Sequence, residues 1–221
     1  GNSISQLALN DNQLYCAGLD SIVQLDLQDG QTQTLRLKDG AYMRRQSARP
    51  LQMTANSERV FVVVQEELSG EVKLVRIEKD GSRVQMRSLV GQSLQRPFAT
   101  LGDSIWFAEQ AGYLLRINAE NGQMVATEQL RSSGQAITQR FVDVKTDLQG
   151  LWALTEDGRI YHRLYGRASW MAMAKRPGVP KGYRGWQCLE LGPRGDIYVG
   201  GRGEMWHYDH YKDDWVAIDP Q

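Results

Sequence analysis

The stretch at 102–123, "GDSIWFAEQAGYLLRINAENGQ", predicts two short strands joined by a tight turn. It begins with a turn and the apolar pair Ile105-Trp106, continues through an alternating run, and ends in an Asn-Gly pair typical of a hairpin reversal. Two strands cannot by themselves bury so much aromatic and aliphatic surface. The stretch therefore predicts a sheet that packs against other parts of the chain.

The aliphatic-aromatic pair of this stretch recurs along the whole chain. Its five occurrences, which follow one another after 46, 45, 46 and 46 residues, are Leu14-Tyr15, Val60-Phe61, Ile105-Trp106, Leu151-Trp152 and Ile197-Tyr198. Each unit holds four segments of strand character separated by turn residues, and no stretch has a convincing helical period. The pattern predicts an all-β fold, a five-bladed β-propeller with four antiparallel strands per blade and a period of about 46 residues. We expect one domain over 1–221, with blades at about 4–38, 50–90, 97–130, 141–174 and 185–218.

The composition limits the classes of partner. The 221 residues include 41% hydrophobic residues, 26 Lys and Arg, and 26 Asp and Glu. A net charge of zero gives no electrostatic argument for a nucleic-acid or membrane partner. No apolar run is long enough for a spanning helix. We therefore expect a globular chain with no nucleic-acid partner and no membrane insertion. We also expect a monomer.

The two cysteines bear on how the ring closes. The repeat starts with an inner strand and ends with an outer one, so closure would depend on side-chain packing between the first and fifth units. Cys16 belongs to the second strand of unit one and Cys188 to the first strand of unit five, so they are neighbours only if five units close the ring. The sequence favours two packed free thiols there. A disulfide, which would indicate an oxidising compartment, and no proximity at all are the alternatives.

Three segments resemble known propeller families. "RPFATLGDSIWFAEQAGYLLRINAENG" (96–122) resembles the repeat of streptogramin-lyase-like and sensor-type propellers. "DLQGLWALTEDGRIYH" (147–162) and "GPRGDIYVGGRGEMWHYD" (192–209) resemble the periplasmic propellers of two-component regulators. Period and blade count resemble the five-bladed tachylectin-type lectins, whose landmarks are matched by "GYRGWQCLELGPRGDIYVGG" (182–201) in unit five alone. The resemblance implies the propeller fold and an extracytoplasmic location, periplasmic or secreted, but it assigns no sugar-binding or catalytic residue.

A basic set of connections is the strongest candidate site. The segments 40–49, 90–96, 129–140 and 174–185, which lead from an outer strand to the next inner strand, hold ten Lys or Arg and no acid among 41 residues. An Arg precedes the inner strand in units two to five, which predicts a partial ring at the channel mouth that binds carboxylate, sulfate or phosphate. The candidate ligand-binding residues are Arg49, Arg96, Arg140, Arg184, Arg44, Arg45, Lys181, Tyr42 and Tyr183.

An alternative is that these arginines join loops to one another. Connections from second to third strands, expected on the same face, carry Asp20, Glu66, Glu67, Glu109, Glu156 and Asp157. Surface pairs between the two sets would contribute little energy each. The sequence leaves both interpretations open.

Other chemistry-bearing residues give weaker signals. His207, Asp209 and His210 are of types that bind divalent metals, but His207 follows an aromatic residue just as His162 does one unit earlier. Asp143 and Glu190 lie on expected inner strands, where five-bladed glycosidases carry carboxylates. At least four of the six tryptophans are expected in the inter-blade core. We expect no catalytic residue, metal site or cofactor.

The sequence therefore favours a non-catalytic binding module, an interaction or sensor domain that presents its channel-face loops to a protein or acidic partner. The alternatives are lectin-like binding of amino or anionic sugars and, third, a carbohydrate-active enzyme.

Overall fold

The computed structural model describes residues 6–10, 12–18, 21–36, 48–56, 59–66, 69–78, 83–88, 98–109, 112–147, 149–178, 185–192, 195–201 and 203–218. These residues form strands and turns and contain no α-helix. Among them, no helix is present that has the length and hydrophobicity to span a membrane.

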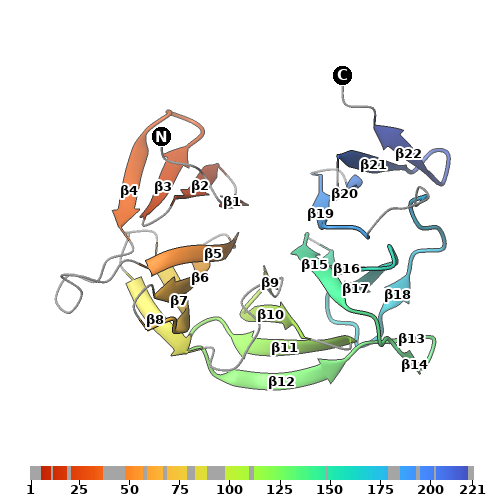
Figure 1. Ribbon diagram of the computed structural model, residues 1–221, viewed down its shortest axis with the longest axis horizontal. Helices are drawn as coiled ribbons and strands as arrows, with labels where there is room; N and C mark the ends of the chain where they lie inside the picture. Colours follow the sequence, from red (N-terminus) through yellow and green to blue (C-terminus); the bar gives the residue numbers. More distant parts are fainter. Residues whose placement is uncertain are drawn as a thin grey trace. The chain divides into compact units, whose positions relative to one another are not determined.

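Twenty strands form five four-stranded antiparallel sheets, here called blades 1 to 5, each in sequence order (Figure 1). Blade 1 is β1 (Gln6–Asn10), β2 (Gln13–Ala17), β3 (Ser21–Asp26) and β4 (Thr32–Arg36). Blade 2 is β5 (Ala48–Ala55), β6 (Arg59–Glu66), β7 (Val72–Glu78) and β8 (Arg83–Ser88). Blade 3 is β9 (Phe98–Leu101), β10 (Ser104–Ala108), β11 (Tyr113–Asn118) and β12 (Met124–Gln129).

Blade 4 is β15 (Phe141–Thr146), β16 (Gly150–Thr155), β17 (Ile160–Leu164) and β18 (Met171–Ala172). Blade 5 is β19 (Cys188–Leu191), β20 (Ile197–Gly201), β21 (Glu204–Asp209) and β22 (Asp214–Ile218). The predicted fold class, a five-bladed β-propeller with four antiparallel strands per blade, is confirmed. The sequence did not predict the small hairpin of β13 (Arg131–Ser132) and β14 (Gln135–Ala136), which lies in the connection between blades 3 and 4.

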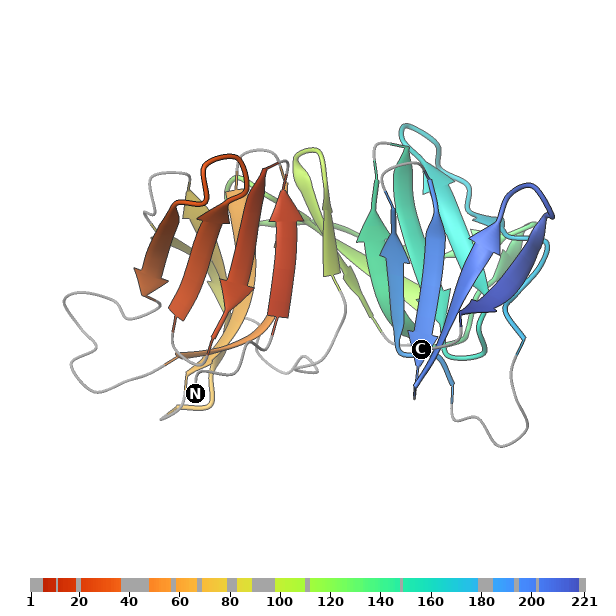
Figure 2. The same cartoon turned by 90° about the horizontal axis from the view of Figure 1, so that it is seen from above.

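The chain divides into two compact units. The first holds 1–95 and 120–123, with blades 1 and 2, and the second holds 96–119 and 124–221, with blades 3 to 5. Figure 2 shows blade 1, in red, lying over blade 2, in orange to yellow, within the first unit. Closure between blades 1 and 5 would join the two units, and it stays a prediction.

The repeated aromatic residue occupies one position in every blade. It lies on the second strand, directly opposite a polar or basic residue of the third strand, in the pairs Tyr15 and Gln24, Phe61 and Arg76, Trp106 and Arg116, Trp152 and His162, and Tyr198 and His207. Because side chains alternate along a strand, one face of each blade carries this pair.

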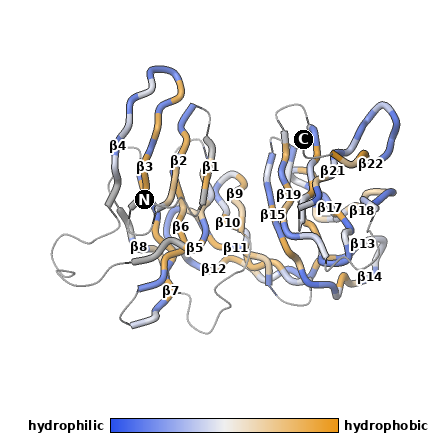
Figure 3. Tube along the Cα trace, turned by 45° about the horizontal axis from the view of Figure 1, so that its top comes forward, coloured by the Kyte–Doolittle hydropathy of each residue, from blue (hydrophilic) through white to orange (hydrophobic). Residues whose placement is uncertain are grey.

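Hydrophobic residues bury the faces between neighbouring blades within each unit. In the first unit, Tyr15 and Ile22 of blade 1 pack with valines of blade 2. In the second unit, Trp106 and Trp170 belong to the core between blades 3 and 4, and Trp186 and Trp215 belong to the core between blades 4 and 5. Four buried tryptophans in inter-blade cores confirm the prediction. Figure 3 shows the hydrophilic turn between β21 and β22 in blue.

Both cysteines are free thiols, so the disulfide alternative is not formed. The expectation that both are buried is wrong, because Cys16 is half-buried and Cys188 is exposed. The reason is the two-residue period of a strand: Leu189 faces the core, so its neighbours Cys188 and Glu190 face away from it.

Candidate functional site

The structure describes only part of the predicted channel-face set. Arg140 is exposed and forms no ion pair within the described part of the chain, and its carbonyl oxygen accepts a 3.0 Å hydrogen bond from the Glu156 amide. Arg49 lies on β5 opposite Gln65, and its side chain is outside the described residues. The remaining members also lie outside the described residues: Arg96, Arg184, Arg44, Arg45, Lys181, Tyr42 and Tyr183. The arginine ring stays a prediction.

Ion pairs between loops are present for some charges of the alternative interpretation. Arg176, in the connection after blade 4, lies 3.8 Å from Asp157, which also pairs with Arg159 at 3.1 Å. Glu66 pairs with Lys73 within blade 2, and this hydrogen bond holds the pKa of the Glu66 carboxyl below its usual value. The Arg176–Asp157 pair therefore joins two connections, whereas the Asp157–Arg159 and Glu66–Lys73 pairs each lie within one hairpin.

A pocket of about 580 Å³ lies between blades 3 and 4, inside the second unit. Blade 3 supplies the turn between β9 and β10 and inward-facing residues of three strands: Leu101, Asp103, Ser104, Trp106, Arg116 and Glu128. Blade 4 supplies the end of β17 and the connection that follows it: Arg163, Leu164, Tyr165, Gly166, Arg167 and Ala168. Both turns lie at the opposite end of their blades from the connection at 130–140.

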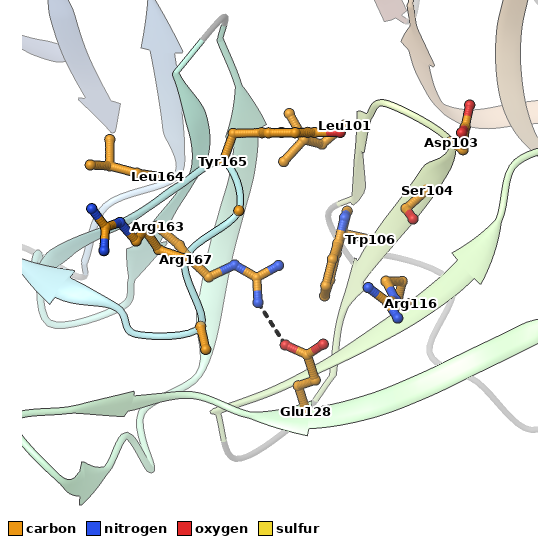
Figure 4. Close-up of a pocket in the computed structure, with 12 residues that line it drawn as sticks. Leu101, Asp103, Ser104, Trp106, Arg116, Glu128, Arg163, Leu164, Tyr165 and Arg167 are labelled. Atoms are coloured by element: carbon orange, nitrogen blue, oxygen red, sulfur yellow. Dashed lines mark hydrogen bonds and ion pairs between the residues drawn. The ribbon is translucent and has the colours of Figure 1, made fainter.

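Two guanidinium groups flank the central tryptophan of this pocket (Figure 4). The Arg163 guanidinium carbon lies 4.4 Å from the centre of the Trp106 ring, and that of Arg116 lies 5.5 Å from it. Cations over an indole face are attracted by the negative potential of the π-system. The strand alternation explains the placement, because Trp106 and Arg116 are cross-strand partners on one face of blade 3.

Arg163 also connects the two blades electrostatically. Its Nη1 donates to Glu128 Oε2 at 2.7 Å, and its guanidinium carbon lies 5.5 Å from the Trp170 ring centre. Only 11% of the Arg163 side chain is exposed, against 33% for Glu128. This charge is therefore paired and stacked, and it holds blade 4 against blade 3.

Arg116 and Trp106, in contrast, carry donors that the protein leaves unused. Trp106 is 2% exposed, yet its Nε1–H has no acceptor, and the buried Nε–H of Arg116 has none either. No ion pair of Arg116 exists within the part of the chain that the structure describes. Since unpaired buried donors are costly, a pocket lined by them favours a ligand that supplies acceptors.

The inner-strand carboxylates form a separate cluster between blades 4 and 5. Asp143 accepts hydrogen bonds from the amides of Val144, at 2.8 Å, and of Leu189 on the neighbouring blade, at 2.9 Å. Lys145 Nζ lies 2.7 Å from Glu190 and 3.9 Å from Asp143. The lysine thus pairs with both carboxylates, an arrangement that holds the inner strands β15 and β19 together.

The pKa of the Asp143 carboxyl predicts that the stability of the protein depends on pH. Burial raises the pKa of this carboxyl from 3.8 to about 6, against the opposing effects of Lys145 and the two amides. The native state therefore takes up a proton before the unfolded state does, so stability rises as the pH falls from about 6 towards 4.

We expect the wild type to gain about 1 kcal/mol of unfolding free energy, relative to Asp143→Asn, between about pH 7 and pH 5. Urea melts of both proteins at each pH would measure this. If the stabilities of the wild type and of Asp143→Asn changed with pH in parallel, the pKa of Asp143 would not be raised in the folded protein.

The histidines show packing contacts. His162 stacks on Trp152 and His207 stacks on Tyr198, each with ring centres 4.8 Å apart. Burial lowers the pKa of His162.

Within the described residues, no group of three or more His, Cys, Asp or Glu side chains is placed to hold a metal ion.

Comparison with solved structures agrees with this architecture. The chain is similar to the β-propeller domain of Myceliophteria thermophila Cps50 (Swd1), with 13% identity, a TM-score of 0.61, and coverage of 98% of this chain and 72% of that one. It is similar to YCF48 bound to D1 peptide, with 12% identity, a TM-score of 0.58 and coverage of 99% and 68%. It is also similar to Myxococcus xanthus glutaminyl cyclase, with 10% identity, a TM-score of 0.53 and coverage of 99% and 92%.

These likenesses define the class of the protein as a β-propeller. No protein-family model and no curated sequence matches the chain. At identities of 10–13% the likeness extends to the fold alone. The resemblance to streptogramin-lyase-like, sensor-type or tachylectin-type repeats is not confirmed by it.

Sequence reasoning missed the pocket. It placed Trp106 correctly in an inter-blade core but gave no role to Arg116 or Arg163, which lie inside alternating strand patterns. A signal was present in the repeat itself: Arg116 and His162 occupy the same cross-strand position in consecutive blades. Comparing that position across the units would have singled out the one Arg-Trp pair.

Proposed function

We propose that this chain is a non-catalytic protein-interaction module whose binding site is the pocket around Trp106. The observation that carries the proposal is a pocket of about 580 Å³ in which the buried Trp106 indole N–H and the buried Arg116 Nε–H have no hydrogen-bond acceptor in the described part of the chain. Its volume lies in the range of sites for small ligands and peptide segments.

The lining suits a segment of a partner protein. Tyr165 is 69% exposed at the rim, and tyrosine and arginine are enriched at the energetic centres of protein interfaces. Among the solved propellers that this chain resembles, YCF48 is described as bound to a D1 peptide. An extracytoplasmic location, the channel-face arginines and the sensor-type or lectin-like resemblance remain predictions beside this proposal.

The test is binding of a peptide array to the purified chain, followed by anisotropy measurements on the peptides that bind. We expect Trp106→Phe to weaken binding about tenfold or more, since the ring remains while the N–H donor is lost. Trp206→Phe is the matched control, because the Trp206 indole donates weakly to Glu204 at 3.5 Å in blade 5, away from the pocket.

Mass spectrometry of the recovered peptides separates binding from catalysis, and unchanged peptides are expected. A chain that binds no peptide, or that converts the peptides it binds, would contradict the proposed function. Binding of sulfated or amino sugars in their place would favour the lectin-like alternative.

A further inference from the structure

Blade 4 aligns with blade 3 position for position around the pocket tryptophan. "TLGDSIW" (100–106) and "TDLQGLW" (146–152) align without a gap. Leu101 pairs with Ser104, and the Asp147 amide donates to the Gly150 carbonyl at 3.1 Å, so both segments close a two-residue turn between first and second strands. Blade 4 is therefore an internal reference for what surrounds this tryptophan.

In blade 4 the protein itself supplies a carboxylate to the indole. Asp147 Oδ2 accepts from Trp152 Nε1 at 3.0 Å, while Oδ1 accepts from the amides of Gln149, at 2.8 Å, and Gly150, at 2.9 Å. Blade 5 also places a carboxylate beside its pair, with Asp196 Oδ1 3.5 Å from His207 Nε2. An aspartate next to the aromatic-basic pair is thus the arrangement of both following blades.

Blade 3 has no carboxylate at the position of Asp147, although its third strand carries a permanent cation beside the tryptophan. Leu101 stands where blade 4 has Asp147, and Arg116, a permanent cation, stands where blade 4 has His162. The remaining acid of the turn, Asp103, is exposed and forms no ion pair within the described ranges. The buried donors of blade 3 consequently face a pocket in the place where blade 4 holds an acceptor.

We propose that the pocket binds a carboxylate of the partner protein, in the position that the Asp147 carboxylate holds in blade 4. One oxygen accepts from Trp106 Nε1, and the group pairs with the Arg116 guanidinium. This inference rests on the proposed function and names the chemistry of its ligand. The carboxylate belongs either to an acidic side chain or to the C-terminus of the partner.

The rest of the lining agrees with an acidic ligand. Arg167 is exposed at the rim and adds positive charge, whereas Glu128 is already paired with Arg163. Leu101 and the Tyr165 ring give an apolar wall beside the donors (Figure 4). Such a wall contacts the carbon atoms next to the carboxylate and strengthens its hydrogen bonds by excluding water.

Leu101→Asp tests the inference because it restores the blade 4 residue. The new carboxylate would accept from Trp106 and pair with Arg116, and we expect it to weaken peptide binding about tenfold or more. The thermal midpoint of the Leu101→Asp variant should equal or exceed that of the wild type. In its NMR spectrum, the Trp106 indole N–H resonance should move to the chemical shift of a hydrogen-bonded donor.

Gln149→Asp is the charge control, since Gln149 is exposed in the equivalent turn of blade 4 and corresponds to Asp103 of blade 3. It should bind as the wild type does.

Arg116→Gln is a second test that adds no charge. It should lose binding to a similar extent with little change in stability, because no protein carboxylate of the described residues loses a partner.

The peptides are synthesised in matched forms to identify the source of the carboxylate. Loss of binding on C-terminal amidation assigns it to the C-terminus, and loss on replacing internal Glu by Gln assigns it to a side chain. Unchanged affinity of Leu101→Asp and Arg116→Gln, or equal binding of peptides without any carboxylate, would overturn the inference and leave the proposed function standing. Absence of all peptide binding would overturn both.

Discussion

Gly112→Ala is expected to lower the free energy of unfolding by about 4 kcal/mol. Gly112 has a φ of 76°, a left-handed conformation that L-residues adopt at a cost. A Cβ at this position would also overlap the carbonyl oxygen of Ile137. That oxygen cannot move freely, because Ile137 donates to Leu130 at 2.9 Å, Leu130 donates to Gly112 at 2.8 Å, and both side chains belong to the core between blades 3 and 4.

Gly134→Ala separates the two causes. Gly134 has nearly the same φ, 79°, but nothing lies within 4 Å of an added Cβ. We expect it to cost only the conformational part, about 1 kcal/mol. Thermal and urea melts would compare the two variants, with about a 10 °C fall in Tm for Gly112→Ala. Equal losses in both would show that the Ile137 segment gives way and that the overlap is unimportant.

The strands could be predicted because their signal is local and repeated. An aromatic residue every 45 or 46 positions, with alternating neighbours and turn residues on each side, specifies a strand pair wherever it occurs. The small β13–β14 hairpin has no such signal, since two residue pairs are too few for an alternating pattern. Its turn residues Ser133 and Gly134, both at positive φ, looked like part of a longer connection.

The pocket could not be predicted in the same way because it depends on contacts between blades. Arg163 fits the alternating pattern of strand β17 like any other residue of the strand. Its sequence neighbours do not indicate that its guanidinium lies against Trp106 of the preceding blade. Charge counting favoured the basic connections, which are conspicuous in sequence, over single arginines within strands. The informative comparison is between repeats: two turns that align without a gap can still differ in one chemically important residue, and the difference between Leu101 and Asp147 marks a candidate site.

Arg163→Met is expected to lower the free energy of unfolding by about 3 kcal/mol. The substitution keeps much of the aliphatic length but leaves Glu128 without its 2.7 Å partner at a side chain only 33% exposed. It also removes the cation from between the Trp106 and Trp170 rings. Because these contacts join blades 3 and 4, the loss should appear as a lower urea midpoint of the second unit, with increased amide exchange in β17.

We expect most of the loss to come from leaving Glu128 unpaired, and a double-mutant cycle tests this. In Arg163→Met with Glu128→Leu, no charge remains unpaired, so the double variant should recover part of the loss seen in Arg163→Met alone. Arg167→Met is the matched control on the same pocket. Its guanidinium is exposed and has no ion pair in the described part of the chain, so its effect should stay within about 0.5 kcal/mol. Additive losses in the cycle would mean that Arg163 acts through its aromatic contacts rather than through Glu128.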